Sequence, residues 1–277
     1  MADPNVITSR RHSLVKELSE IRDDRDSPLM FLEGPRLVRE LLESSIIVEI
    51  LVWTQSAEGE EVVKSAQLKA KRKLQVSESV FKSISDVDNP QGILAIARCP
   101  EWSWSDIINR TPAPIVVLDG VQDPGNVATI VRTAEASGAA GIVTTPGTAH
   151  LFSPKALRGA MGSTLRLPCL EHVSVRDIVK ELRKNTILLV AATVVQKTKG
   201  KGISRSQVLS ELPLQYTQLN WKMASAILLG QEGRGISDEW DSHIHQAIFV
   251  PMQPPVESLN VAAAAALLLY ESFRQRI

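Results

Sequence analysis

Residues 114–133 read PIVVLDGVQDPGNVATIVRT, and this stretch decides the fold that we expect. Its continuous apolar run, 115–118, is typical of a parallel strand that is buried on both faces. The Asp-Pro-Gly-Asn sequence at 123–126 predicts a turn, and a helix is expected over 127–136. Two later stretches also end an apolar run in a polar loop: ILLGQEGRGIS at 227–237 and IFVPMQPPVESLN at 248–260. Ligands bind at loops that follow the carboxyl ends of parallel strands, so the three loops predict one composite site.

The rest of the chain alternates helical and strand patterns, which predicts an α/β protein with two domains. Residues 1–100 read as a first α/β domain with its own apolar pattern, and residues 101–113 (EWSWSDIINRTPA) read as a linker. Residues 114–277 are predicted to form the second domain. Its strands are expected at 115–118, 141–145, 167–171, 187–193, 226–229 and 247–250. Helices are expected over 175–184 and from Pro154, which Ser153 would cap, and 196–218 is expected to be a long polar connection. Its alanine-rich last helix, 260–274, is expected to be buried on every side.

Composition narrows the class of protein. Apolar residues make up 44% of the 277 residues, which is enough for packed cores. No apolar run reaches the about 18 residues that a membrane-spanning helix needs, and the acid-rich N-terminus lacks the apolar segment of a secretory signal. Cys99 and Cys169 stand alone, without the spacing of a metal site or a disulfide framework. We therefore expect a cytoplasmic protein without a metal site.

The charge balance is neutral, with 31 basic and 31 acidic residues, whereas RNA-binding proteins are often basic overall. The distribution of charge matters more than the sum. Local basic clusters lie at 10–12, 69–73 and 197–201. They form an RNA-binding surface only if they share one face of the molecule. Otherwise each is a solvated loop or helix face, and the sequence leaves both interpretations open.

The first polar loop carries Asn126 and, six residues later, Arg132. A helix N-terminus offers unpaired N–H groups that attract a phosphate. Arg132 follows two apolar residues, so we expect it to be semi-buried and to need a partner. A guanidinium binds phosphate through two parallel hydrogen bonds, but it is not deprotonated in proteins. We therefore expect Arg132 to position a phosphate and to stabilise a developing alkoxide, rather than to act as a base.

The second loop places Glu232 among glycines, and the third places Ser258 and Asn260 before the last helix. Glycines such as Gly230 and Gly235 permit positive φ and close approach of the backbone to a ligand. The pattern is neither a Walker loop nor a dinucleotide-binding GxGxxG, which argues against NTP and NAD. Ser258 also fits a simple role as the N-cap of the last helix.

These three motifs, in this order and spacing, closely resemble those of the SpoU (TrmH) family of RNA 2′-O-ribose methyltransferases. The resemblance covers nearly the whole chain. The segments FLEGPRLVRELLES and ISDVDNPQGILAIA resemble the substrate-binding module that precedes the SpoU domain, whose fold is similar to that of ribosomal protein L30e. The resemblance implies that residues 1–100 bind RNA, although a structural or dimer-supporting role is the alternative. For residues 114–277 it implies a SPOUT α/β domain with a parallel sheet and a C-terminal trefoil knot.

The same resemblance implies S-adenosylmethionine as cofactor and a homodimer formed through the C-terminal domain. It leaves open whether Arg132 acts within its own chain or across the dimer. The implied catalytic residues are Arg132, Asn126, Glu232, Ser258 and Asn260. The implied cofactor-binding residues are Thr145, Gly230, Gly235, Val250, Met252, Ser258 and Leu259. The chain departs from the family at Gln231, where a small residue is usual, and at Ala160, where Ser is common.

The activity implied is methylation of a ribose 2′-oxygen in RNA, with 23S-type ribosomal RNA as the expected substrate. A tRNA substrate is one alternative. A catalytically silent RNA-binding protein of the same fold is another, and the joint presence of the five motif residues argues against it. A nucleotide-binding hydrolase would need a phosphate loop or a Ser-His-Asp set, and His243 and His245 are expected on the surface instead. The reaction calls for no metal, because the methyl donor carries its own leaving group.

Overall fold

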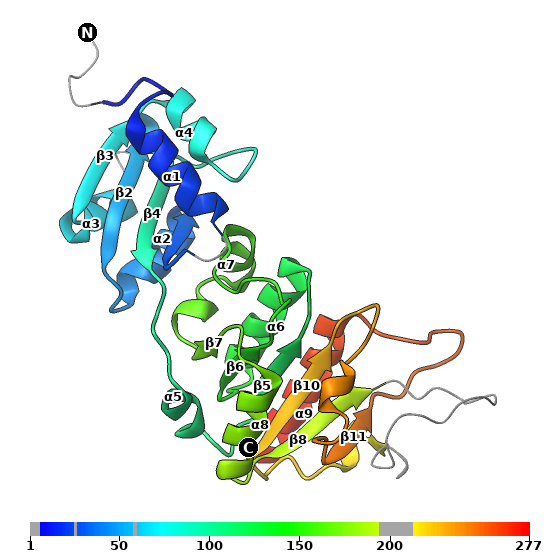
Figure 1. Cartoon of the computed structure of the whole chain (residues 1–277). Coiled ribbons are helices and arrows are strands. Elements are labelled where there is room, and N and C mark those ends of the chain that lie inside the picture. The colour runs from blue at the N-terminus through cyan, green and yellow to red at the C-terminus, as the bar shows by residue number, and fades with distance from the viewer. Residues whose placement is uncertain (1–5, 25–26, 58–59, 194–212) are drawn as a thin grey trace. The chain divides into compact units, whose positions relative to one another are not determined.

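The computed structural model describes residues 6–24, 27–57, 60–193 and 213–277 (Figure 1). Contacts divide the chain into two compact units. The first unit comprises Met1–Glu101 and His150–Arg166, and the second comprises Trp102–Ala149 and Leu167–Ile277. Each unit has its own sheet and its own buried apolar cluster. Among the described residues, no helix combines the length and the apolarity needed to cross a membrane.

The first unit is built on a four-stranded sheet in the order β1-β4-β2-β3. The strands are β1 (Leu29–Glu33), β2 (Val48–Thr54), β3 (Arg72–Val76) and β4 (Ile93–Arg98). β4 runs antiparallel to β1 and β2, whereas β2 and β3 are parallel. The helices are α1 (Ser13–Asp23), α2 (Pro35–Glu43), α3 (Glu61–Lys69) and α4 (Glu78–Ile84). α1 and α4 bury their apolar sides against the sheet in a cluster that includes Leu18, Phe31 and Phe81.

A further helix of the first unit, α7 (Pro154–Ala160), comes from the middle of the sequence. It begins as predicted, because Ser153 accepts a hydrogen bond from the Ala156 N–H and Pro154 occupies the first turn. α7 packs against β1, and Arg158 forms an ion pair with Asp86 at 2.8 Å. The domain predicted to run continuously from residue 114 is therefore interrupted, since 150–166 pack with the first unit.

The second unit is built on a seven-stranded sheet in the order β7-β6-β5-β10-β8-β11-β9. Every pairing in it is parallel, as the continuous apolar runs predicted. The strands are β5 (Ile115–Asp119), β6 (Gly141–Thr144), β7 (Cys169–Leu170), β8 (Leu188–Thr193), β9 (Leu214–Gln215), β10 (Ser225–Gly230) and β11 (Gln246–Phe249).

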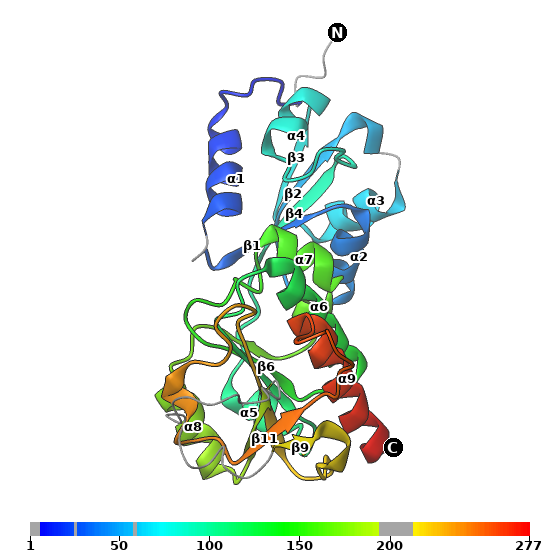
Figure 2. The ribbon, with the colours of Figure 1, turned by 90° about the vertical axis from the view of Figure 1, so that its right-hand side faces the viewer.

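Helices cover both faces of this sheet (Figure 2). α6 (Pro124–Ala136) and α9 (Val261–Arg276) lie side by side on one face, and α5 (Trp104–Ile108) and α8 (Val175–Lys184) lie on the other. α8 has the bounds that the sequence predicts. Ser174 caps it by accepting from the Asp177 N–H, and Ile178, Val179 and Leu182 form its buried side.

Two stretches differ from their predicted structure. The predicted linker contains α5, which a capping box of Ser103 and Asp106 begins, and its Ile107 is fully buried in the core of the second unit. The basic cluster at 69–73 ends α3 and begins β3, a strand that the sequence did not predict. Arg72 and Lys73 are exposed, and only Leu74 and Val76 of this edge strand pack against the apolar cluster, so the apolar pattern is too short to indicate a strand.

The sequence predicts a last helix that is buried on every side, but one side of α9 is exposed. Ala262, Ala265, Leu268 and Leu269 are buried, but Ala263, Leu267 and Tyr270 are exposed on another side of α9. The polar connection expected at 196–218 is described only in part. Its residues 213–218 contain β9 and a 3-10 turn (Tyr216–Gln218), whereas the basic cluster at 197–201 lies outside the described residues.

Candidate active site

Four strands of the second unit end at one edge of the sheet: β6, β5 and β10 are neighbours, and β8 separates β10 from β11. β5 ends at Asp119, β6 at Thr144, β10 at Gly230 and β11 at Phe249, and the sheet order and parallel direction place these ends together. The three loops that the sequence singled out all leave from this edge. The edge is therefore the place where a composite site can form.

The first loop leads into α6 earlier than predicted. α6 begins at Pro124, and the Asp123 side chain caps it by accepting a 2.8 Å hydrogen bond from the Asn126 N–H. Asn126 therefore lies in the first helical turn rather than in a turn before the helix. Its side chain is held at the N-terminal end of α6, beside the carboxyl edge of the sheet.

A chain of hydrogen bonds joins the three sequence motifs. Asn126 Nδ2 donates to Glu232 Oε1 at 2.5 Å, and Asn260 Nδ2 donates to Asn126 Oδ1 at 3.0 Å. Asn260 Oδ1 in turn accepts from the Ala262 and Ala263 N–H groups at 2.8 and 3.3 Å, which makes Asn260 the N-cap of α9. The amide orientation of Asn126 follows from this arrangement, because a carboxylate can only accept. Residues 106 and 134 positions apart are thus brought into one polar network.

The loop that carries Glu232 folds back on itself. Gln231 N donates to Gly235 O at 3.1 Å, and Gly235 N donates to Gln231 O at 2.8 Å. Gly235 has φ +74°, a conformation that side chains rarely adopt. A Cβ on Gly230 would lie 2.3 Å from the carbonyl carbon of Gly235. The glycines at both positions are therefore required for the loop to return to the strand end from which it leaves.

Sequence reasoning did not identify Asp119, which is a buried polar residue of this edge. The residue as a whole is 7% exposed. Oδ1 accepts a 2.9 Å hydrogen bond from Thr145 Oγ1, and Oδ2 accepts a 2.8 Å hydrogen bond from Ser237 N. The available signal was a charged residue that ends an otherwise apolar strand, where charged side chains are rarely buried without partners. Thr145, predicted to bind the cofactor, is 3% exposed and is held by this carboxylate.

Other predicted site residues stand apart from the network. Arg132 was expected to be semi-buried with a partner; it is exposed, and its guanidinium has no hydrogen bond or ion pair with a described residue. Ser258 is exposed and is not the N-cap of α9, because Asn260 has that place. Val250 and Met252 are half-buried after β11, and Leu259 is 38% exposed.

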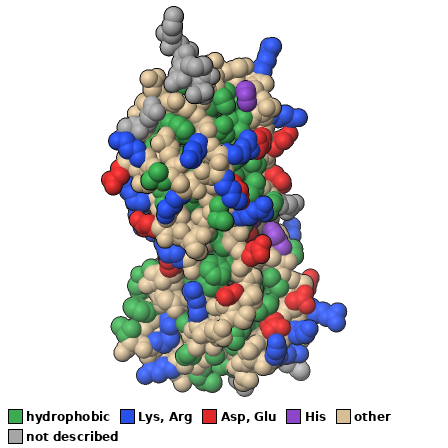
Figure 3. Space-filling model, turned by 90° about the vertical axis from the view of Figure 1, so that its left-hand side faces the viewer, with side chains coloured by type: hydrophobic (Ala, Val, Ile, Leu, Met, Phe, Trp, Pro, Cys, Tyr) green, Lys and Arg blue, Asp and Glu red, His purple; other side chains and the backbone are tan. Residues whose placement is uncertain are grey.

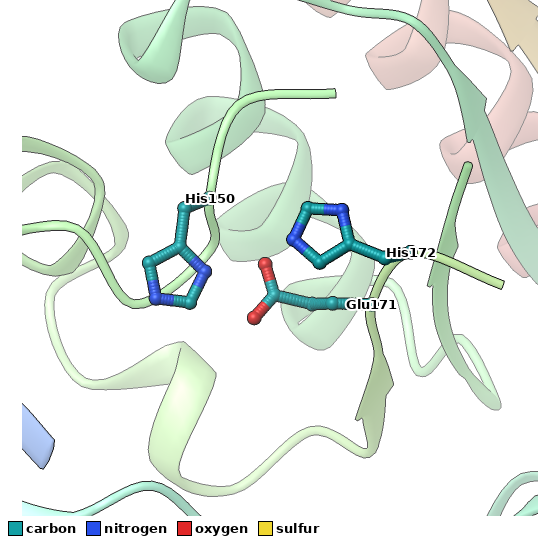
Figure 4. A group of neighbouring side chains, drawn as sticks. All are labelled: His150, Glu171 and His172. Carbon is teal, nitrogen blue, oxygen red and sulfur yellow. The ribbon is translucent and has the colours of Figure 1, made fainter. Parts of the chain in front are cut away.

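Among the described residues, the remaining titratable side chains form no metal centre within either unit. Figure 4 draws His150, Glu171 and His172, whose side chains are of metal-ligating types. Glu171 and His172 follow β7 in the second unit, whereas His150 belongs to the first unit, so the three define no site within either unit. Cys99 and Cys169 form no disulfide. Burial raises the pKa of the Cys169 thiol far above its ordinary value, so this thiol is a poor metal ligand.

The two histidines expected on the surface, His243 and His245, make hydrogen bonds near the starts of β8 and β11. His245 is exposed, and its Nδ1 accepts from Leu189 N at 3.0 Å. His243 is half-buried, and its Nδ1 lies 3.1 Å from Arg183 Nη2. Both are on the side of the sheet where β8 and β11 begin, so neither belongs to the carboxyl edge.

Comparison with known proteins places this geometry in a family. A 23S rRNA (guanosine(2553)-2′-O)-methyltransferase, RlmP, from Bacillus subtilis (strain 168) is 29% identical over 268 residues, which cover 95% of this chain and 97% of the relative. The mitochondrial rRNA methyltransferase 3A of Danio rerio is 29% identical and is matched over 96% of this chain and 68% of its own length.

A solved structure is also similar. The AdoMet-bound rRNA methyltransferase from Sinorhizobium meliloti superposes with a TM-score of 0.81 at 25% identity, and the match covers 98% of each chain. Residues 14–95 match the MRM3-like substrate binding domain. Residues 113–270, which include all three motifs and the polar network, match the SpoU rRNA Methylase family. The chain therefore belongs to the SpoU rRNA methylase family.

Proposed function

We propose that this chain is an S-adenosylmethionine-dependent methyltransferase that modifies a ribose 2′-oxygen of ribosomal RNA. The observation that carries the proposal is the hydrogen-bonded chain Glu232–Asn126–Asn260, which links all three family motifs at the carboxyl edge of a parallel sheet. Relatives that match nearly the whole chain are named as a 23S rRNA methyltransferase and as a mitochondrial rRNA methyltransferase. A cytoplasmic location stays a prediction, because one of these relatives is mitochondrial.

The residues present at the edge fit S-adenosylmethionine. The backbone of Gly235 is open to a ligand, since a Cβ there would meet no atom within 4 Å, and Gly230 lies directly against it at the end of β10. The half-buried apolar side chains of Val250 and Met252 flank the same edge. We therefore assign the cofactor to Thr145, Gly230, Gly235, Val250, Met252 and Leu259. When bound, the cofactor supplies a methyl group on a sulfonium, whose departure leaves a neutral thioether.

The chain's own residues position and stabilise the reacting oxygen in this proposal. Arg132 is always charged and can hold a phosphate of the substrate through two hydrogen bonds. It also stabilises negative charge on the 2′-oxygen, while the proton passes to phosphate or water. Glu232 and Asn260 fix both ends of the Asn126 amide, which keeps Asn126 in one orientation. Ser258 lies two residues before that network and faces solvent, where substrate can reach it.

We assign RNA binding to the first unit. Figure 3 shows Lys and Arg side chains gathered on one face of this unit, in the upper half of the view, with Asp and Glu among them. Several cations are already engaged: Lys71 pairs with Glu49 at 3.0 Å, and Arg72 pairs with Glu17. The exposed side chains of Arg11 and Lys73 have no ion pair with a described residue. These two are therefore the better candidates for contacts with phosphates.

We also propose that the enzyme is a homodimer that pairs through α9. The exposed side of α9, with Ala263, Leu267, Tyr270 and Phe273, lines an apolar groove of about 800 Å³ together with Leu259 and Ile277. Leu267 is 40% exposed and Tyr270 is 50% exposed. A helix face of this kind can pair with its own copy across a two-fold axis, and small alanines permit close approach of the two backbones.

The dimer also bears on Arg132. Arg132 is exposed on α6, the helix that lies beside α9, and it makes no bond to Asn126 or Glu232. An Arg132 that completes the partner's site accounts for both facts. The trefoil knot stays a prediction of the family resemblance; residues 250–260, between β11 and α9, are the segment that would make the passage.

The test is transfer of a labelled methyl group from S-adenosylmethionine to RNA by the purified full-length chain. Ribosomal RNA and tRNA are offered in parallel, and the modified position is mapped by resistance to alkaline cleavage. We expect ribose methylation of ribosomal RNA. Methylation of tRNA alone would replace the proposed substrate. Absence of S-adenosylmethionine binding in calorimetry would remove the proposed activity altogether.

A further inference from the structure

Asp119 is the buried carboxylate of the second unit's carboxyl edge, and the proposed reaction does not use it. Asp119 is 7% exposed, and within the described part of the chain each carboxylate oxygen accepts from one donor. The donors are a hydroxyl and a backbone N–H, so both are neutral. A buried charge held only by neutral donors is costly unless its geometry is well defined. Its presence here calls for an explanation beyond core packing.

The two donors lie on different loops. Thr145 follows directly after β6, whereas Ser237 ends the GQEGRGIS loop that begins at Gly230. Asp119 pairs with Gly230 across the β5–β10 ladder. The loop therefore leaves the sheet beside Asp119 and returns to the Asp119 carboxylate at Ser237. Between these two points lies Glu232, whose carboxylate accepts from Asn126.

We propose that Asp119 is a positioning residue for the cofactor site. Its carboxylate fixes Thr145 on one side and closes the glycine-rich loop on the other. The inference rests on the proposed function, because it concerns residues assigned to the cofactor. A loop with glycines at 230, 233 and 235 has a large conformational entropy when it is free. Charge-assisted hydrogen bonds to a backbone N–H are stronger than neutral ones, so this contact stabilises one loop conformation before ligand binds.

The first unit supplies a matched control. Glu33 ends β1, is 5% exposed, and accepts from Ser85 Oγ at 2.5 Å and from Asp86 N at 3.0 Å. It is thus a buried carboxylate at a strand end with the same two kinds of donor. A Glu33→Ala change removes a similar pair of hydrogen bonds, and both belong to the first unit, away from the residues assigned to the cofactor.

The experiment compares Asp119→Ala with Glu33→Ala in the full-length protein. Calorimetry gives the Kd of S-adenosylmethionine and of its demethylated product, and circular dichroism gives the melting temperature. Both variants should melt at a lower temperature than wild type. Asp119→Ala should raise both Kd values by about 10-fold or more, the order expected when a buried hydrogen-bond partner is lost, while Glu33→Ala should leave them unchanged. Equal Kd values in Asp119→Ala and wild type, or an equal rise in Glu33→Ala, would overturn the inference.

Two further variants separate geometry from stability. Asp119→Asn can still accept from Ser237 N through its carbonyl oxygen, and its amide can donate to the Thr145 hydroxyl. It should restore the Kd to within about threefold of wild type, since it recovers most of the energy of a buried hydrogen-bond pair. An Asp119→Asn protein as weak as Asp119→Ala would contradict a role in positioning.

If Asp119→Ala does not fold, two variants of Thr145 test the inference instead. Thr145→Val removes one donor, and Thr145→Ser keeps it. A higher Kd for Thr145→Val than for Thr145→Ser supports the inference, and equal values overturn it. Wild-type protein that binds no S-adenosylmethionine would instead refute the proposed function, so the two failures are distinguishable.

Discussion

The two units use the same chemistry at their strand ends for different purposes. In the first unit, the two donors to Glu33 are neighbours in sequence, Ser85 and Asp86, so the carboxylate closes one loop. In the second, the donors to Asp119 are Thr145 and Ser237, which are 92 positions apart (237 − 145) and belong to separate loops. One carboxylate completes a local turn, and the other joins distant parts of the chain.

Topology explains the difference. In the second unit every strand pairing is parallel, so the loops after β5, β6, β10 and β11 all start at one edge. In the first unit β4 runs backwards between β1 and β2, so its own loop leaves from the opposite edge. The parallel sheet therefore gathers polar residues of several loops into one site, whereas in the mixed sheet the buried carboxylate of Glu33 is bound by a single loop.

The largest effect is expected from a change on the exposed side of α9. Leu267→Glu would place a charge in the proposed dimer contact, and burial of an unpaired charge costs about 3–5 kcal/mol. We expect monomers in light scattering and loss of measurable methylation. The matched change Leu68→Glu, on an α3 leucine that is 87% exposed in the first unit, should leave both mass and activity unchanged. A dimeric, active Leu267→Glu protein would contradict pairing through α9.

A loss of about 100-fold or more in rate is expected for Arg132→Lys, the size typical for removal of one donor to a developing oxyanion. Lysine keeps the charge but cannot form the two parallel hydrogen bonds of the guanidinium. Cofactor affinity should stay near wild type in calorimetry. Single-turnover methylation measures the rate, and wild-type turnover would exclude both the phosphate contact and the catalytic role.

The same residue tests whether the second unit is complete within one chain. Arg132→Ala and Asn126→Ala proteins are mixed and allowed to exchange subunits. If Arg132 serves the partner's site, mixed dimers contain one intact site and regain activity that neither parent has. If Arg132 serves its own chain, both sites of the mixed dimer remain damaged and activity does not return.

A smaller effect, of about 10-fold, is expected for RNA affinity when Arg11→Glu and Lys73→Glu are combined in the first unit, because two phosphate contacts and their counterion release are lost. The slope of affinity against salt should become shallower, and the Kd of S-adenosylmethionine should not change. Lys180→Glu with Lys222→Glu reverses two exposed charges of the second unit and serves as control. An equal loss in the control would move RNA binding away from the first unit.

The smallest effect concerns the two thiols, one in each unit. Cys169 is buried, and its burial raises the pKa of the thiol far above the ordinary value, so the reactive thiolate is scarce at pH 8. Cys99 is half-buried. A thiol reagent should therefore label Cys99 in the native protein and Cys169 only after unfolding, as peptide mass mapping would show. If the reagent labelled Cys169 faster than Cys99 in the native protein, the buried position of Cys169 in β7 would be contradicted.

Local signals in the sequence predicted much of the fold. Ser174 and the apolar spacing of Ile178 and Leu182 set the bounds of α8, and Ser153-Pro154 set the start of α7. The apolar runs predicted the parallel strands of the second unit. By contrast, β3 was missed because it begins with exposed Arg72 and Lys73, and Leu74 and Val76 alone are too few apolar positions to indicate a strand.

The sequence predicted which residues belong to the site but not the hydrogen bonds that join them. Asn126, Glu232 and Asn260 were identified by family resemblance, yet their hydrogen bonds depend on strand order, which local patterns do not contain. Asp119 was passed over because a single carboxylate at a strand end resembles many solvated ones; only its burial between Thr145 and Ser237 distinguishes it. Arg132 was expected to be semi-buried, but α6 turns it towards solvent.

The membership of α7 in the first unit has a consequence for synthesis on the ribosome. Domains generally fold as units while the chain emerges from its N-terminal end. The first unit, however, lacks a helix until residue 166 has been made, because 150–166 pack with Met1–Glu101. By then β5, α6 and β6 of the second unit have already been translated. The nascent chain must therefore hold an incomplete first unit while the second begins. If the gene is divided after residue 101, the N-terminal product lacks α7, and the C-terminal product carries α7 without the sheet against which it packs.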